Sequence, residues 1–222
     1  MSHPQPSPSP EPVEIPLELR LAEIWGKYKI QMVAGAILVL AVAGVHQATT
    51  AANQNREAQA QALLDQAVNL QKTEGKNDGI VSVESLRKTF SEFPGTLAGG
   101  QALLLYADSL FQAGNFNESA TAYTRFTTEY PKHPLLYAGY YGAASCREAA
   151  GALDEAVSLY QNIRTKGPKN DLWRGYAMIS LARCLEIKND PAGARQVYDE
   201  ILTNPLPDSL KRMAQERRVR LG

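Results

Sequence analysis

The sequence has few of the residues from which catalytic and metal sites are built. Its 222 residues include only three histidines, His3, His46 and His133, which lie far apart along the chain. Such scattered histidines do not suggest a metal site or a catalytic dyad. The chain also lacks a Gly-rich phosphate loop, a His-Glu-x-x-His pair and a Gly-x-Ser-x-Gly turn. We therefore predict a protein that is not an enzyme and that has no cofactor, no metal and no small-molecule substrate.

The sequence also lacks an excess of charge of either sign. It has 23 Lys and Arg residues against 23 Asp and Glu residues, so its formal net charge is zero. A large imbalance would suggest attraction to nucleic acid or to an acidic partner. The balance predicts no nucleic-acid partner.

Proline is concentrated at the beginning of the chain, where apolar residues are almost missing. Residues 1–16 contain prolines at positions 4, 6, 8, 10, 12 and 16. A segment of this composition cannot bury enough apolar surface to fold. Residues 1–16 are therefore predicted to be an extended, disordered tail.

The longest apolar run is Ile30–Val45, 16 residues with a single polar member, Gln31. At about 1.5 Å per residue it spans roughly 24 Å as a helix, which is short for a membrane core of about 30 Å. Small and hydroxylated residues at 48–52 can extend the run. Residues 17–52 are thus predicted to be a juxtamembrane helix and transmembrane anchor, with a buried core helix or a cleaved signal peptide as alternatives.

Charged and aromatic residues beside this run predict its orientation. Trp25 precedes it, and Arg20, Lys27 and Lys29 lie on the same side, whereas the first basic residue on the other side is Arg56. Aromatic and basic residues are expected at the headgroup level, and basic residues stay in the cytoplasm. We therefore predict a single-pass protein whose N-terminus is cytoplasmic and whose remaining residues lie across the membrane.

The pattern between Gly100 and Pro131 returns twice downstream. The tyrosines at 123, 160 and 198 recur at intervals of 37 and 38 residues, and Gly114 aligns with Gly151. The third copy has a weaker turn, where Asp190-Pro191-Ala192-Gly193-Ala194 replaces the Gly-x-x-Asp-Glu-Ala pattern. A period in this range is typical of stacked helical hairpins. The sequence therefore predicts an all-α fold built as an α-solenoid.

These units resemble tetratricopeptide repeats. When each copy is counted from Gly100, Tyr137 or Gly175, small residues stand at positions 8 and 20, namely Ala107, Ala144, Ala182, Ser119, Ala156 and Ala194. The Trp often seen at position 4 is replaced by Leu103, Tyr140 and Met178, and three to four extra residues separate the repeats. This longer form, with Tyr130-Pro131 ending a helix, resembles the repeats of bacterial envelope proteins.

The resemblance implies a domain plan for residues 53–222. We expect a degenerate hairpin at 53–94, repeats at about 100–131, 137–168 and 175–206, and a capping helix at 208–221. A solenoid needs such a polar-faced terminal helix to remain soluble.

The resemblance also implies a binding surface on the concave side, which the first helix of each repeat lines. In the family, positions 2, 5, 9, 12 and 13 face it, and here they include Leu104, Asp108, Phe111, Tyr141, Ser145, Glu148, Tyr176, Ile179, Arg183 and Glu186. Aromatic anchors among mixed charges suit an extended peptide or a partner helix, with Arg183 orienting an acidic group. The alternative is that some of these aromatic residues pack against the next repeat.

The two cysteines, Cys146 and Cys184, both fall at position 10 of their repeats. Equal height on neighbouring helices would favour a disulfide. Helix axes about 8 to 10 Å apart, however, exceed the Cα separation of about 7 Å that a disulfide can bridge. We favour two free thiols that pack as small apolar side chains.

The order of tail, single span and repeats resembles the ancillary subunit of the bacterial Sec translocon. This resemblance implies a protein–protein interaction scaffold anchored in the inner (cytoplasmic) membrane, with its repeats in the periplasm, linking the translocon to periplasmic chaperones. The alternative is a scaffold for outer-membrane assembly or for cell-wall synthesis at division.

Overall fold

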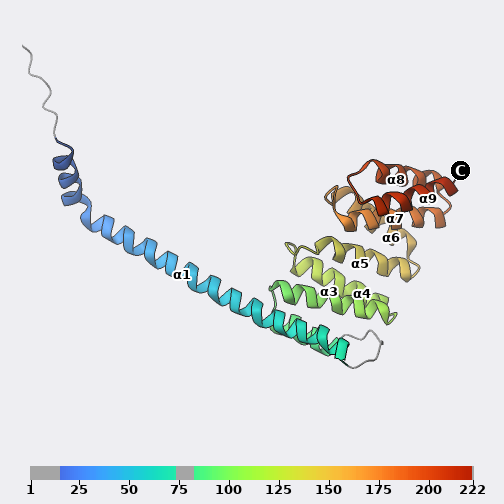
Figure 1. The fold of residues 1–222 in the computed structure, drawn as a ribbon, viewed down its shortest axis with the longest axis horizontal. Helices are drawn as coiled ribbons and strands as arrows, with labels where there is room; N and C mark the ends of the chain where they lie inside the picture. Colours follow the sequence, from blue (N-terminus) through green and yellow to red (C-terminus); the bar gives the residue numbers. More distant parts are fainter. Residues whose placement is uncertain (1–15, 74–82, 222) are drawn as a thin grey trace, which may run out of the picture. The chain divides into compact units, whose positions relative to one another are not determined.

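The computed structural model describes residues 16–73 and 83–221, which form nine α-helices and no strand (Figure 1). The helices are α1 (Leu17–Thr73), α2 (Val83–Glu92), α3 (Leu97–Gln112), α4 (Phe116–Glu129), α5 (Leu136–Ala149), α6 (Leu153–Lys166), α7 (Leu172–Ile187), α8 (Pro191–Thr203) and α9 (Asp208–Arg220). The predicted all-α class is confirmed. The predicted disordered tail falls almost wholly on residues 1–15, outside the described residues.

The chain divides into two compact units, residues 1–53 and 54–222. The described part of the first unit is the N-terminal stretch of α1, in which the apolar side chains of residues 30–45 are open to the surroundings. Ile30, Leu38 and Leu40 expose 77%, 66% and 71% of their surface. Between Trp25 and Val68 the helix is long and apolar enough to cross a membrane, a property that a signal sequence near the N-terminus shares.

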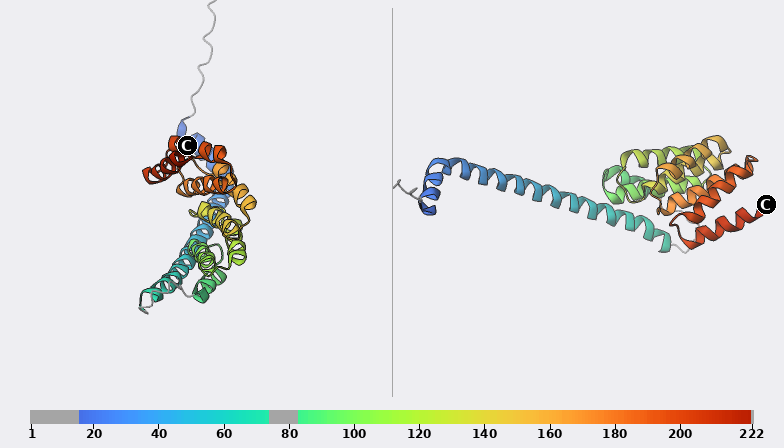
Figure 2. Two further views of the ribbon diagram at one scale, coloured as in Figure 1. Left: turned by 90° about the vertical axis from the view of Figure 1, so that its right-hand side faces the viewer. Right: turned by 90° about the horizontal axis from the view of Figure 1, so that it is seen from above.

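The second unit is a stack of helical hairpins. Each helix from α2 to α9 packs against its neighbour in sequence, and α5 also packs against α3 and α7. The hairpins α3–α4, α5–α6 and α7–α8 follow one another along a curved array, and α9 closes its end (Figure 2). Contacts of this kind, limited to neighbouring repeats, define a solenoid.

Small residues allow the two helices of each hairpin to approach closely. The six small residues at positions 8 and 20 of the repeats are all fully buried, namely Ala107, Ala144, Ala182, Ser119, Ala156 and Ala194. The Ser119 hydroxyl donates a hydrogen bond of 2.7 Å to the Ala107 carbonyl across the first hairpin. Buried tyrosines at 123, 160 and 198 fill the space one turn further along the second helices.

The turns of the hairpins need a residue in the left-handed backbone region. Gly114 and Gly151 each have φ of +79°, which glycine adopts without steric cost. In the third hairpin the equivalent residue is Asn189, with φ of 61°. Asparagine is one of the few other residues that tolerate this conformation. The third turn therefore keeps the backbone of the first two, although its sequence has lost the glycine.

The C-terminal part of α1 is attached to the solenoid by a carboxylate. Ala60, Leu64 and Ala67 are buried beside α2 and α3 in the same apolar core. Glu57 accepts hydrogen bonds of 2.7 and 2.8 Å from the backbone N–H groups of Leu97 and Ala98. These N–H groups belong to the first turn of α3, where the helix dipole also favours a negative charge.

The close contact between helices can be tested by overpacking it. Ala156→Leu adds three carbon atoms at a fully buried position and is expected to lower the free energy of unfolding by about 1 to 3 kcal/mol. The measurement is denaturant unfolding followed by Trp173 fluorescence, in a chain whose other tryptophan is replaced by Trp25→Phe. Glu155→Ala, one residue away with an exposed side chain, is the control and should change stability little. Equal unfolding of the two variants would contradict this packing.

Candidate partner-binding groove

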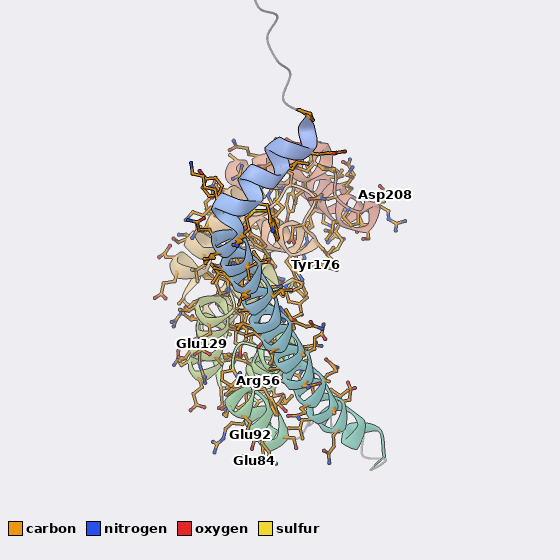
Figure 3. All side chains as sticks on the ribbon, turned by 90° about the vertical axis from the view of Figure 1, so that its left-hand side faces the viewer. Arg56, Glu84, Glu92, Glu129, Tyr176 and Asp208 are labelled. Atoms are coloured by element: carbon orange, nitrogen blue, oxygen red, sulfur yellow. The ribbon has the colours of Figure 1, made fainter. Side chains whose placement is uncertain are left out.

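The inner face of the solenoid is formed by the first helices of the hairpins, α3, α5 and α7. Figure 3 shows Tyr176 of α7 on the inner side of the curve and Glu129 of α4 on the outer side. A hollow of about 330 Å³ opens on this inner face, and we call it the inner hollow. Its lining residues are Leu104, Asp108, Phe111, Tyr123, Leu135, Ala138, Tyr141, Gly142, Ser145 and Trp173.

The inner hollow brings together five of the ten residues predicted from the sequence. Three come from α3 and two from α5, namely Leu104, Asp108, Phe111, Tyr141 and Ser145. Gly142 leaves the space into which Tyr123 extends, because a Cβ atom at position 142 would lie 2.3 Å from the tyrosine ring. The shape of the hollow therefore depends on a glycine of α5 and a tyrosine of α4.

A tyrosine from each second helix holds a carboxylate of its partner helix. The hydroxyl of Tyr123 donates to Asp108, and that of Tyr198 donates to Glu186. In the middle hairpin the Tyr160 hydroxyl donates to Glu148 at 2.9 Å and also contacts Ser145 at 3.0 Å. These bonds fix the three predicted acidic residues of the inner face, Asp108, Glu148 and Glu186.

Burial shapes the ionisation of these pairs. It raises the pKa of the Tyr123, Tyr160 and Tyr198 hydroxyls above their ordinary value, so all three remain donors at neutral pH. Burial also raises the pKa of the Asp108 carboxyl, while the hydrogen bond from Tyr123 acts in the opposite direction. Since burial is the larger of the two causes, the surroundings of Asp108 disfavour its charged form.

Arg183 forms an ion pair within the chain itself. Its guanidinium makes hydrogen bonds of 3.1 and 2.6 Å to one oxygen of Glu148 and joins α7 to α5. A carboxylate of the chain itself therefore takes up part of the guanidinium that was expected to orient an acidic group of a ligand, and that ligand contact stays a prediction. Glu186 likewise faces Arg217 at 3.9 Å.

The aromatic residues of α5 and α7 form a cluster beside the inner hollow. The ring centroid of Tyr141 lies 5.6 Å from that of Trp173 and 6.3 Å from that of Tyr176. The ring centroids of Trp173 and Tyr176 are 5.8 Å apart. Trp173 was not among the predicted site residues, because it lies before the counted start of its repeat at Gly175. Its position three residues before Tyr176 places both on one helix face, which is the sequence signal that could have found it.

Ile179 does not belong to this surface. It exposes only 5% of its surface and packs in the apolar core with Tyr160 and Tyr198. The structure therefore places Ile179 in the core and not on the open surface where it was predicted.

A second hollow of about 320 Å³ lies among α4, α5 and α6. Its apolar lining includes Tyr137, Tyr140 and Leu159. It includes none of the ten predicted residues. Among the residues that the structure describes, no group of three His, Cys, Asp or Glu side chains is placed to hold a metal ion.

Comparisons with known proteins agree with the repeat architecture. Residues 99–171 match the tetratricopeptide repeat family. A tetratricopeptide repeat protein from Parabacteroides merdae is 17% identical with a TM-score of 0.53, over 64% of this chain and 52% of that one. The TPR-like repeats of a putative kinesin light chain from Podosopora anserina are 17% identical with a TM-score of 0.54, over 74% and 86% of the two chains.

These similarities concern the fold. The chain spans about half the length of the Parabacteroides protein, and the comparison with curated proteins found no match. The sequence match and the structures together support a tetratricopeptide-type solenoid, a fold that generally serves as a protein–protein interaction scaffold.

The buried cysteines allow a test of the packing behind the inner face. Cys146 and Cys184 are free, and burial raises the pKa of both thiols, that of Cys184 to about 11. Because the thiolate is the reactive form, the thiol reagent DTNB should modify neither in the native chain near neutral pH. Two thiols should react after unfolding in guanidinium. No reaction after unfolding would reveal a disulfide, and fast reaction of the native chain would contradict the burial.

Proposed function

We propose that this tetratricopeptide-type solenoid is a membrane-anchored scaffold that binds an extended peptide or a helix of a partner protein on its inner face. The observation that carries the proposal is the inner hollow, which is bordered by Phe111, Tyr141 and Trp173. Aromatic side chains in a partly enclosed site are the usual anchors of a protein interface. The role is one of binding without catalysis.

The contacting surface extends beyond the inner hollow along α5 and α7. Tyr176 is 36% exposed at the edge of the aromatic cluster, and the pair of Glu148 and Arg183 lies on the same inner face. A ligand would therefore meet apolar rings at one end of this surface and an internally neutralised ion pair further along. This sequence of features suits a peptide that lies across several repeats.

The proposed anchor is the part of α1 within residues 17–52. None of its most apolar window is buried within the protein, which argues against a core helix and favours a lipid environment. Lys27 and Lys29 lie before the apolar run, and Arg56 is the first basic residue after it. The positive-inside rule then supports a cytoplasmic N-terminus and periplasmic repeats in an inner (cytoplasmic) membrane protein.

The layout is similar to that of the ancillary subunit of the Sec translocon, and we propose a link between the translocon and periplasmic chaperones. A scaffold for outer-membrane assembly or for cell-wall synthesis at division is the alternative. Cross-linking in membranes followed by purification separates the two. Translocon subunits and nascent chains are expected for the first role, and assembly or division proteins for the second.

The orientation can be measured with a reporter. Alkaline phosphatase fused after Gly222 should be active, because this enzyme folds only after export and the basic residues Lys27 and Lys29 hold the other end in the cytoplasm. An alkaline wash should leave the full-length chain in the membrane pellet. An inactive fusion would show that the orientation is the opposite of the proposed one. Release of a chain that begins near Asn53 would identify a cleaved signal peptide.

The binding surface can be tested with three aromatic truncations. Phe111→Ala, Tyr141→Ala and Tyr176→Ala should each weaken binding of the purified partner by about 2 kcal/mol, measured as a change in Kd by titration of the full chain in detergent. Thermal unfolding of each variant separates a lost contact from a lost fold.

The control for these variants lies on the last helix. Lys211→Glu and Arg212→Glu reverse charges on α9, away from the residues that line the inner hollow, and should leave the Kd unchanged. Loss of binding in the α9 variants with normal binding in the aromatic variants would place the site elsewhere.

A further inference from the structure

The three carboxylates of the inner face differ in their positive partners. A guanidinium nitrogen of Arg183 lies 2.6 Å from a carboxylate oxygen of Glu148, and one of Arg217 lies 3.9 Å from a carboxylate oxygen of Glu186. Asp108 forms no ion pair with any residue in the described ranges 16–73 and 83–221, and its carboxylate accepts a hydrogen bond from the neutral hydroxyl of Tyr123. The first hairpin therefore presents a carboxylate without a counter-charge, whereas the next two present neutralised ones.

Asp108 does not share a repeat position with the two glutamates, since it stands at position 9 of its repeat and they stand at position 12 of theirs. Arg183 stands at position 9 of the third repeat and reaches back to Glu148 of the second. The same position of the second repeat is occupied by Ser145, which turns instead to the hydroxyl of Tyr160 at 3.0 Å. The second repeat thus supplies no guanidinium to the first. In its place is open space, because Asp108 and Ser145 both line the inner hollow.

The walls of the inner hollow are suited to a cation. On the α3 side, Phe111 packs edge-on against Phe116, with their ring centroids 5.3 Å apart. On the opposite side, the ring centroids of Tyr141 and Trp173 are 5.6 Å apart. Aromatic faces attract a Lys or Arg head group, and more strongly where water is partly excluded. The long aliphatic stem of such a side chain would also gain from apolar contacts with Leu104 and Ala138.

The energetics favour a ligand that carries positive charge. Partial burial removes water from a carboxylate, and the lost free energy of hydration is offset only by hydrogen bonds or by an opposite charge. Tyr123 supplies one hydrogen bond to Asp108, and a charged donor would form a shorter and stronger one with the remaining acceptor capacity. An acidic or purely apolar side chain would leave this carboxylate uncompensated.

We propose that the inner hollow binds a Lys or Arg side chain of the partner, with Asp108 as its counter-charge and Phe111, Tyr141 and Trp173 as its aromatic walls. This inference rests on the proposed function, because it names the chemical class of residue that the same surface selects. The partner segment is accordingly a peptide or helix with a basic residue at the position that faces α3 and α5.

The test uses short peptides on the full chain in neutral-lipid nanodiscs, with Trp25→Phe so that Trp173 is the sole tryptophan. The probes are acetyl-Ala-Lys-Ala-amide and acetyl-Ala-Arg-Ala-amide, with acetyl-Ala-norleucine-Ala-amide as the uncharged isostere, at matched ionic strength. The basic probes should change Trp173 fluorescence saturably and bind about tenfold more tightly than the norleucine probe, as expected for a hydrogen bond to a charged group. Equal binding of basic and norleucine probes would overturn the proposal without any variant.

Asp108→Asn removes the charge and keeps an acceptor for the Tyr123 hydroxyl. It should weaken the basic probes about tenfold and leave the norleucine probe unchanged, while Glu92→Gln, at the exposed end of α2 (Figure 3), should affect none of them. Unchanged binding of the basic probes to Asp108→Asn would overturn the proposal.

The two proposals fail in different ways. Binding of the basic probes could prove independent of Asp108 while the aromatic truncations still weaken binding of the purified partner. The inner face would then be a binding site that does not select a basic side chain. If the aromatic truncations leave that partner bound, the proposed function itself is wrong.

Discussion

The close approach of the two helices in each hairpin is the contact on which the rest of the solenoid depends. It requires a small residue on each side, such as Ala144 against Ala156, both fully buried. A larger side chain would separate the helices and lose the dispersion contacts along their whole length. Where the helices meet, a tyrosine such as Tyr160 can cross from the second helix to the inner face and place its hydroxyl beside a carboxylate.

This crossing links the core to the binding surface. Tyr123 is buried along most of its ring, passes over Gly142 and ends at Asp108 in the inner hollow. The same side chain therefore fills the core and fixes the direction of a polar group on the inner face. A substitution that shortens Tyr123 would be expected to affect both, so a stability measurement has to accompany any binding measurement at this position.

Differences between repeats, more than their similarity, give the inner face its chemical character. Position 9 is Asp108 in the first copy, Ser145 in the second and Arg183 in the third. The Arg183 guanidinium forms an ion pair with Glu148 of the second copy. The first copy keeps an unneutralised carboxylate beside aromatic rings. A repeat architecture allows this because each position can vary without disturbing the small residues and tyrosines that hold the hairpins together.

The sequence by itself determined the helical class, the period of the repeats and the apolar character of the stretch around Ile30–Val45, because these follow from residue spacing and composition. The resemblance to tetratricopeptide repeats also indicated five of the ten residues that line the inner hollow. The tertiary structure alone decided the contact of Trp173 with Tyr141, the ion pair of Arg183 with Glu148 and the capping of α3 by Glu57. Each depends on a contact between residues more than 30 positions apart, and the packing of whole helices sets which side chains meet there.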